Sequence, residues 1–312
     1  MCVIKTLKIR VALVSVITCL GLAFSGCSKH EATVAEVGED GAPQTDSTST
    51  MVPLTKVERT KHSRKLNDTG ITWGGNYPKD INYECTALVN VDQLPDGETV
   101  TGDILAQQDC ANGWDKTAGE NGLAAYLYKK IGTKGELLAD DASSWSCVLD
   151  EVTGLVWEVK QDADGEYGKG VLNDADDLFM WYNSNIYNNG GAIGNWNSQF
   201  DQCAGYEAGK PTTYCNIEQF AARVNEQGLC GANDWRIPSR PELESLVNFG
   251  QTMPAIENAY FRDTKNEFYW SNTPVAGFKG SAWAVSFQFG FSAPLPRDNS
   301  RHVRLVRSYV SQ

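Results

Sequence analysis

The most informative segment of the chain for its fold is Cys230-Gly-Ala-Asn-Asp-Trp-Arg-Ile-Pro-Ser-Arg-Pro-Glu-Leu243. Within it, Ser239 is followed three residues later by Glu242. This is the spacing of a capping box, in which two side chains satisfy free N–H groups at a helix N-terminus. We therefore expect a helix to begin at Ser239 and to end at Gly250. Its apolar stripe would consist of Leu243, Leu246 and Val247.

Another helix is expected before this stretch, and strands are expected on both sides of it. Asn216 and Gln219 have the same capping-box spacing, and Gly228 supplies a stop. Apolar runs typical of strands occupy residues 124–131, 153–160, 268–272, 282–289 and 303–310. In the fourth run, alternation predicts one shared face for Trp283, Val285, Phe287 and Phe289. Two short helices followed by antiparallel strands predict an α+β domain with much loop.

The N-terminus is typical of an exported lipoprotein. Three basic residues precede an apolar run over residues 11–24, which is too short to span a bilayer but suits a signal peptide. The run ends in Leu22-Ala-Phe-Ser-Gly-Cys27, which is similar to a lipobox except that Phe24 stands where Leu or Val is usual. We expect residues 1–26 to be removed and Cys27 to be lipidated. An uncleaved anchor or a plain secretory signal is the alternative.

The sequence after Cys27 divides into three parts. Residues 27–65, the lipidated cysteine and a polar stretch, are expected to form a flexible tether because they carry too little apolar surface to fold. Residues 66–144 are predicted as a loop-rich extension and residues 145–312 as the C-terminal domain. Ser28, where an Asp would indicate inner-membrane retention, favours the outer membrane of the cell envelope.

The net charge argues against a nucleic-acid partner. The whole chain carries −12. Loss of the signal peptide removes three positive charges and no negative ones, so the mature chain carries −15. Binding to phosphate backbones relies on Lys and Arg, and a strongly acidic protein is unsuited to it.

Six cysteines follow Cys27, and an even number in an exported chain predicts three disulfides. Six cysteines allow 15 pairings, which the sequence alone does not separate. The pairs that we favour are Cys85–Cys110, Cys147–Cys230 and Cys203–Cys215. A metal site at these cysteines is disfavoured because no C-x-x-C pair is present.

Several motifs resemble the Lcl C-terminal domain family. Trp145-Ser-Cys-Val-Leu-Asp-Glu-Val-Thr-Gly-Leu-Val-Trp-Glu-Val-Lys160 resembles its opening, and the stretch from Cys230 to Leu243 resembles its central motif. Three later stretches resemble the last motifs of the family's domain: Phe268-Tyr-Trp-Ser-Asn272, Ala282-Trp-Ala-Val-Ser-Phe287 and Val303-Arg-Leu-Val-Arg307. The resemblance implies a fold similar to C-type lectins and formylglycine-generating enzymes. It also implies a relationship to surface adhesins that bind sulfated polysaccharides.

Catalytic interpretations are poorly supported. Outside the signal peptide and tether, His302 is the one histidine, so a Ser-His-Asp or Cys-His arrangement would depend on it. Formylglycine-generating enzymes need a late pair of cysteines, and no cysteine follows Cys230. We therefore predict that the protein is not an enzyme.

Calcium is the one cofactor that the sequence suggests. Oxygen ligands in or beside glycine-containing loops are what calcium prefers. The candidate ligands are Asp162, Asp164, Asp174 and Asp176. Gly165 stands at the fourth position of the first loop, so this is not an EF-hand, where the glycine is the sixth. A solvated acidic loop is the alternative.

Ligand contacts are predicted in two segments. Exposed aromatic rings in an Asn- and Gly-rich segment suit a sugar, and they are Trp181, Tyr182, Tyr187 and Trp196. Packing in the core is an equally good explanation of each ring. Residues 268–312 carry five basic side chains against one acid, and of these we assign ligand contact to Arg297 and Arg301. For Arg304 and Arg307, internal pairing is the simpler expectation.

The sequence thus predicts a non-enzymatic surface binding module, displayed on a lipid anchor, for an extracellular polysaccharide. A structural or assembly partner in an envelope protein complex is the alternative, in which the aromatic residues would contact protein in place of sugar.

Overall fold

The computed structural model describes residues 67, 69–71, 73–75, 81–82, 126–196 and 203–309. The predicted signal peptide, Cys27, the tether and the cysteines of the Cys85–Cys110 pair lie outside these residues. None of the helices in the described ranges is long and apolar enough to cross a membrane.

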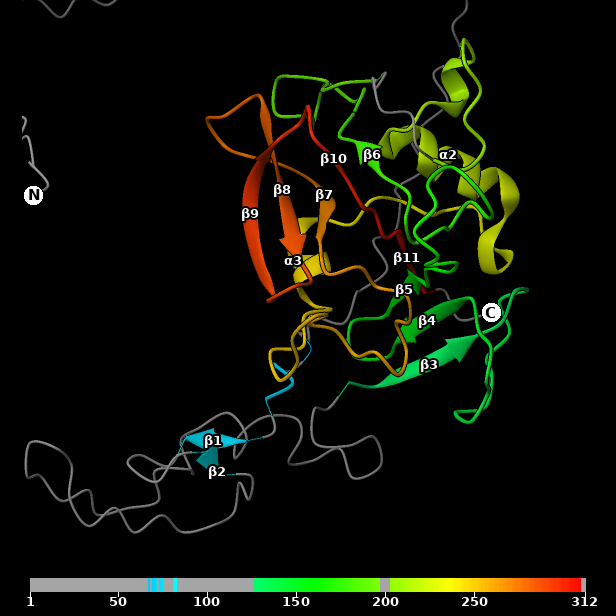
Figure 1. The fold of residues 1–312 in the computed structure, drawn as a ribbon, viewed down its shortest axis with the longest axis vertical. Helices are drawn as coiled ribbons and strands as arrows, with labels where there is room; N and C mark the ends of the chain where they lie inside the picture. The colour runs from blue at the N-terminus through cyan, green and yellow to red at the C-terminus, as the bar shows by residue number, and fades with distance from the viewer. Residues whose placement is uncertain are drawn as a thin grey trace, which may run out of the picture. The chain divides into compact units, whose positions relative to one another are not determined.

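Two antiparallel sheets form the body of the domain (Figure 1). One sheet has the order β11-β5-β4-β3, and its strands are β3 (Tyr128–Ile131), β4 (Cys147–Asp150), β5 (Leu155–Glu158) and β11 (Val306–Ser308). The other has the order β7-β8-β9, with β7 (Phe268–Pro274), β8 (Ser281–Ser286) and β9 (Phe291–Pro296). Two-residue strands pair as β6 (Phe179–Met180) with β10 (Ser300–Arg301), and as β1 (Gly74–Gly75) with β2 (Ile81–Asn82).

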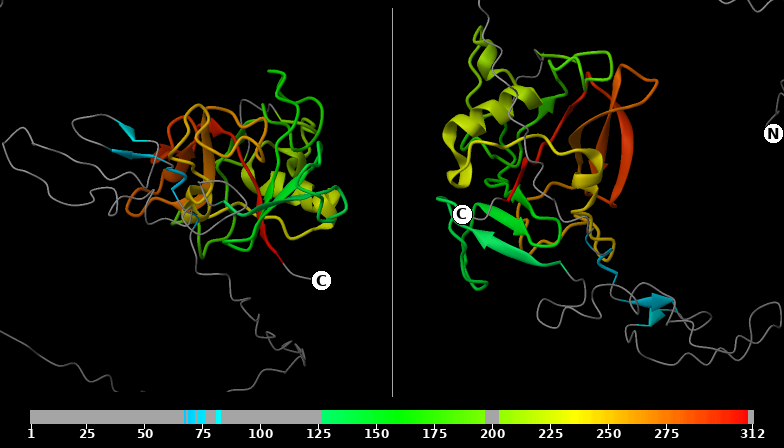
Figure 2. Two further views of the ribbon diagram at one scale, coloured as in Figure 1. Left: turned by 90° about the horizontal axis from the view of Figure 1, so that it is seen from below. Right: turned by 180° about the vertical axis from the view of Figure 1, so that it is seen from behind.

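The two predicted helices are present, and the structure is α+β. Helix α2 (Ile217–Gln227) begins at Asn216, whose side chain accepts a hydrogen bond from the Gln219 backbone N–H, and ends at Gly228 with φ 76°. It lies on the side of the domain away from the β7-β8-β9 sheet (Figure 2). Short 3-10 helices, η3 (Pro211–Thr213) and η4 (Leu229–Gly231), flank it.

The second helix is shorter than predicted. Helix α3 (Arg240–Glu244) has the expected capping box between Ser239 and Glu242. It ends at Glu244 and does not continue to Gly250, because Val247 leaves the helix to form a β-bridge with Ile256. The predicted apolar residues Leu243, Leu246 and Val247 are nevertheless all buried.

The predicted strand over residues 282–289 needs two corrections. It ends at Ser286, and both of its faces are buried, since Ala282 and Ala284 join one apolar cluster while Val285 and Phe287 join the other. Trp283 is partly exposed under the Arg240 guanidinium, and Phe289 is exposed beyond the strand end.

The strand predictions need correction at two further places. The predicted strand over residues 303–310 shrinks to β11, and β9 was not predicted. Strand β9 contains Pro294 and Pro296, which cannot donate to a ladder, and it lies at the sheet edge, where prolines are tolerated.

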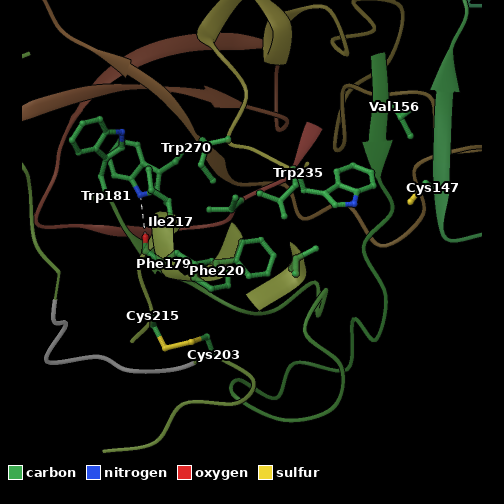
Figure 3. Packing of buried hydrophobic residues seen from close by; sticks show 14 of the residues in the cluster. Cys147, Val156, Phe179, Trp181, Cys203, Cys215, Ile217, Phe220, Trp235 and Trp270 are labelled. Carbon is green, nitrogen blue, oxygen red and sulfur yellow. Dashed lines mark hydrogen bonds between the residues drawn. A yellow bond between two sulfur atoms is a disulfide. The ribbon is translucent and has the colours of Figure 1, made fainter. Parts of the chain in front are cut away.

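Disulfides join Cys147 to Cys230 and Cys203 to Cys215, which are two of the three predicted pairs. The first ties β4 to η4, and the second ties the loop before η3 to the residue that precedes the α2 N-cap. Both lie in a cluster that also holds Phe179, Phe220 and three buried tryptophans (Figure 3). The short Cys203–Cys215 loop contributes roughly 3 kcal/mol on a chain-entropy estimate.

A buried ion pair lies at the end of β5, beside residues 304 and 305. Glu158 and Lys160 are both buried, and their charged atoms are 2.9 Å apart. The Glu158 carboxylate also accepts the Leu305 backbone N–H at 2.7 Å. The backbone carbonyl of Glu158 accepts a hydrogen bond from the Arg304 guanidinium at 2.6 Å. The same guanidinium also donates to the Thr264 hydroxyl at 2.9 Å. Arg304 is therefore internal, as predicted, although its partners are a carbonyl and a hydroxyl and not a carboxylate.

We expect Glu158→Gln to lower the free energy of unfolding by about 3–5 kcal/mol, because it leaves the Lys160 charge buried without a partner. Urea titration at neutral pH measures this change. The matched control is the double variant Glu158→Gln with Lys160→Met, which keeps an oxygen for the Leu305 N–H and removes both charges. Its free energy of unfolding should fall less than that of the single variant. Equal stability of the single and double variants would show that the pair is unimportant.

Candidate functional site

The loop that follows β6 carries most of the predicted aromatic ligand contacts, and we call residues 182–196 the aromatic loop. Its two ends are held side by side. Tyr182 and Gly194 form a β-bridge, and the Asn183 N–H donates to the Ile193 carbonyl at 2.8 Å. The Asn195 N–H donates to the Trp181 carbonyl at 3.1 Å. The loop therefore has the closed base of a hairpin.

Asparagine side chains hold the interior of the aromatic loop. Asn183 Oδ1 accepts from the Asn185 N–H at 2.9 Å, and its amide nitrogen donates to Asn188 Oδ1 at 2.9 Å. Asn185 Oδ1 accepts from the Tyr187 N–H at 3.0 Å, and Asn189 Oδ1 accepts from the Gly191 N–H at 2.9 Å. Such bonds mimic backbone turns. The amides thus fix the loop conformation.

Two predicted ligand contacts lie beneath the loop and not on it. Trp181 is fully buried among the apolar residues that Figure 3 shows. Its indole N–H donates to the Ser271 carbonyl at 2.9 Å. The Arg297 guanidinium lies 3.7 Å from the centre of the Trp181 ring and donates to the carbonyls of Ala192 and Ser281. The prediction that Trp181 and Arg297 contact ligand is therefore wrong, because the two side chains stack on each other as the support of the loop.

Helix α2 fastens the other side of the loop. The Ser184 backbone N–H and hydroxyl both donate to the Glu218 carboxylate, at 2.7 and 2.9 Å. The Asn216 amide donates to the Trp196 carbonyl at 2.8 Å, in addition to capping the helix. The helix N-terminus and the loop thus share one hydrogen-bonded network.

Several large apolar side chains project from this scaffold. Tyr187 is 92% exposed, Ile186 is 72% exposed and Trp196 is 48% exposed. Ile193 is also exposed, whereas Tyr182 is partly buried. Trp196 keeps one neighbour, Tyr214, at a ring separation of 5.2 Å. Of the four predicted aromatic contacts, Tyr187 and Trp196 are therefore the ones most open to a ligand.

The turn between β7 and β8 lies against the loop. A Cβ added at Gly191 would lie 3.3 Å from Cε of Lys279, and one added at Gly190 would lie 2.5 Å from Cβ of Pro274. Lys279 and its neighbour Phe278 are both exposed. Glycine at positions 190 and 191 therefore lets this turn approach the loop closely, and Lys279 adds a positive charge beside the loop at Gly191. Lys279 was counted among the five basic side chains of residues 268–312 but was assigned no ligand contact, because its contact joins segments that are far apart in the chain.

The second predicted arginine, Arg301, is half-buried. It lies on β10 opposite Phe179 of β6, and its Nη1 donates to the Ser300 carbonyl at 2.8 Å. It therefore belongs to the strand pair that leads into the aromatic loop.

The predicted calcium ligands are used mainly within their own loops. Asp164 accepts the Glu166 N–H at 2.8 Å, and Asp176 accepts the Gly165 N–H and pairs with Lys265. Asp162 and Asp174 approach each other, since an oxygen of each lies near a Cβ built on Gly170, at 2.5 and 3.4 Å. Among the described residues, no group of three or more His, Cys, Asp or Glu side chains lies close enough to hold a metal ion. Calcium binding stays a prediction.

Asp174 is nevertheless electrostatically unusual. Its pKa is raised to about 6, chiefly by burial and also by the nearby carboxylates of Asp177, Asp176 and Asp162, although the hydrogen bond from the Asp176 N–H acts in the opposite direction. The folded protein therefore disfavours ionisation of Asp174 relative to an unfolded chain.

His302 is buried in the core. Its ring packs on Tyr269 with the ring centres 5.2 Å apart, and Nδ1 lies 3.2 Å from the Asp177 carbonyl. Burial lowers the pKa of His302 to about 4, so the ring is neutral at neutral pH. These contacts account for the histidine as a packing residue.

Comparison with models of protein families identifies a domain in this chain. The model of the Lcl C-terminal domain matches residues 146–307. A search of curated proteins finds no matching relative.

We expect Asp174→Asn to be more stable than the wild type above pH 6, by roughly 1 kcal/mol after allowance for solvent screening. The folded pKa of about 6 lies above the unfolded value near 3.9, so ionisation penalises the wild type as pH rises through this window. Asparagine avoids that penalty and keeps the bond from the Asp176 N–H.

Thermal unfolding between pH 4 and 8, with a chelator present, measures the difference between variant and wild type. Asp164→Asn is the control, because Asp164 is exposed and should show little pH-dependent difference. An Asp174→Asn variant that is no more stable than wild type at pH 8 would contradict the prediction.

Proposed function

The family match covers more than half of the chain, which therefore belongs to the Lcl C-terminal domain family, and from this we propose that the protein is a non-enzymatic binding module for polysaccharide. The observation that carries the proposal is the exposure of Tyr187 and Trp196 on a loop that is braced from beneath by Trp181 and Arg297. Aromatic rings offer a flat apolar face, which suits the C–H face of a pyranose ring, and a polar tip.

The fixed conformation of the aromatic loop favours binding. Ordering a loop when a ligand binds costs free energy, and a loop that is already ordered avoids much of that cost. Here the asparagine bonds, the Glu218 contact to Ser184 and the Arg297 bond to Ala192 order the loop without a ligand.

An acidic polysaccharide suits the site better than a neutral one. Lys279 is exposed beside Gly191 and takes part in no ion pair among the residues that the structure describes. An unpaired ammonium group at the edge of an aromatic surface can bind a sulfate or carboxylate group. The family's resemblance to adhesins for sulfated polysaccharides agrees with this choice. From the same resemblance we propose that the fold is similar to C-type lectins and formylglycine-generating enzymes.

The proposal includes display on the cell envelope. Lipid on Cys27 would anchor the chain in a membrane, and Ser28 favours the outer membrane over the inner one. The polar residues up to 65 would hold the domain away from the bilayer.

A second function is favoured by one observation. Ile186 and Ile193 are exposed next to Tyr187, and aliphatic side chains suit a protein surface better than a sugar. In that alternative the aromatic loop docks on a protein of an envelope complex.

We expect Tyr187→Ala to weaken binding to an acidic polysaccharide at least about tenfold, the effect of losing one exposed anchor residue. A glycan array with the chain from residue 28 onward identifies the ligand, and titration gives the affinities. Tyr309→Ala is the matched control, because Tyr309 is another exposed tyrosine whose backbone N–H bonds to Gly154 instead.

Lys279→Gln should weaken binding to acidic glycans and leave neutral ones unchanged. Failure to bind any glycan at micromolar concentration would overturn the polysaccharide proposal. Crosslinking through the aromatic loop to a stoichiometric envelope protein in intact cells would then favour the alternative.

We expect the expressed full chain to incorporate a labelled fatty acid and to sediment with membranes, and we expect Cys27→Ser to abolish both. Lipid on the cysteine thiol is the physical anchor, and serine lacks the thiol. Cys19→Ser is the control, since Cys19 lies in the segment that cleavage would discard. Unchanged labelling of Cys27→Ser, or no labelling of wild type, would contradict the anchor.

A further inference from the structure

A second group of exposed apolar side chains surrounds the turn between β8 and β9, and we call it the turn patch. It consists of Phe249, Met253, Phe289 and Phe291, each between 48% and 56% exposed. A Cβ added at Gly290 would lie 3.5 Å from the Phe249 ring, and the Met253 N–H donates to the Gln288 carbonyl at 3.0 Å. These contacts place the four residues on one surface. Contiguous exposed apolar side chains mark a surface that contacts something else.

The residues that flank segment 72–125 on either side are bonded to the domain beside the turn patch. On the N-terminal side, the Thr69 carbonyl accepts the Phe249 N–H at 2.7 Å. On the C-terminal side, the Tyr126 hydroxyl donates to the Val247 carbonyl at 2.8 Å. The domain residues that make these two bonds, Val247 and Phe249, are two residues apart. The chain before the segment and the chain after it therefore meet the domain at the same edge.

The N-terminal attachment is a close contact that the local sequence permits. Gly70 has φ 76°, and a Cβ at this position would lie 2.2 Å from Asn248 Oδ1. A Cβ at Gly250 would lie 2.2 Å from the Gly70 carbonyl oxygen. Asn67 adds side-chain bonds to the Asp150 carboxylate at 2.7 Å and to the Ser245 carbonyl at 3.0 Å. Two glycines and an asparagine therefore fix this end on the domain.

The segment itself carries apolar residues that need a surface to pack on. They include Leu88, Val89, Val91, Leu94, Val100, Ile104, Leu105, Trp114 and Leu123. A chain of fewer than sixty residues that folds alone buries a smaller share of its surface than a larger domain does, and it is correspondingly marginal in stability. A neighbouring apolar surface would add to that burial.

We propose that residues 83–125 of the same chain pack over the turn patch. The extension and the C-terminal domain then share one apolar interface, which is independent of the polysaccharide proposal for the aromatic loop.

The test is photo-crosslinking within the purified full chain. A benzophenone amino acid replaces Phe289, and in a control chain it replaces Leu137, which is exposed in the connection between β3 and β4. The proposal predicts that position 289 crosslinks to peptides within residues 83–125 in a product of monomer mass, several-fold more than position 137 does. Crosslinks between two copies would identify a dimer face, and an absence of crosslinks above the control would identify a free surface. Either result overturns the proposal.

A stability measurement gives an independent test. If the turn patch is covered, Phe289→Ser should lower the Tm of the full chain by several degrees, while Leu137→Ser should leave it nearly unchanged. Equal, small effects of the two substitutions would also overturn the proposal.

Discussion

The buried carboxylate of Glu158 holds the C-terminal segment of the domain against β5. It neutralises Lys160 and accepts the Leu305 N–H, while the Glu158 backbone binds Arg304 and Leu305. Burying an ion pair costs several kcal/mol per charge, and hydrogen bonds to the charged atoms offset part of that cost. Because the Leu305 N–H supplies such a bond, the pair favours the position of the C-terminal segment in which residues 304 and 305 lie against β5.

This constraint extends to the aromatic loop through the chain that leads up to Leu305. The Trp270 N–H donates to the His302 carbonyl, and β10 pairs with β6, the strand from which the loop emerges. A few residues earlier, Arg297 covers Trp181 and binds the loop at Ala192. One short segment thus connects the buried charges to the support of the loop. The exposed position of Tyr187 is a consequence of packing in the core, and it requires no ordering by a ligand.

Local features of the fold were predictable from the sequence, and features set by distant contacts were not. Both helix starts were correct because Asn216 and Ser239 act on groups within three residues of themselves. The end of α3 was wrong because Val247 pairs with Ile256, which lies outside any local pattern. The same distinction applies to the site. The sequence pointed to the loop whose rings are exposed, but no local pattern distinguishes the buried Trp181 and Arg297 from exposed side chains of the same types. Their stacking on each other is a tertiary contact between residues that are far apart in the chain.

The two exposed apolar surfaces of the domain differ in how their backbones are satisfied, and this difference assigns them different roles. The backbone of the aromatic loop is bonded by asparagine side chains of the loop itself and by Glu218 and Arg297 of the C-terminal domain, so its projecting side chains belong to a scaffold that is complete within that domain. At the turn patch, in contrast, the Phe249 N–H is satisfied by Thr69, which belongs to the extension. A surface whose backbone bonds come from another segment of the chain is suited to burial under that segment. A surface that is complete by itself is suited to a ligand from outside.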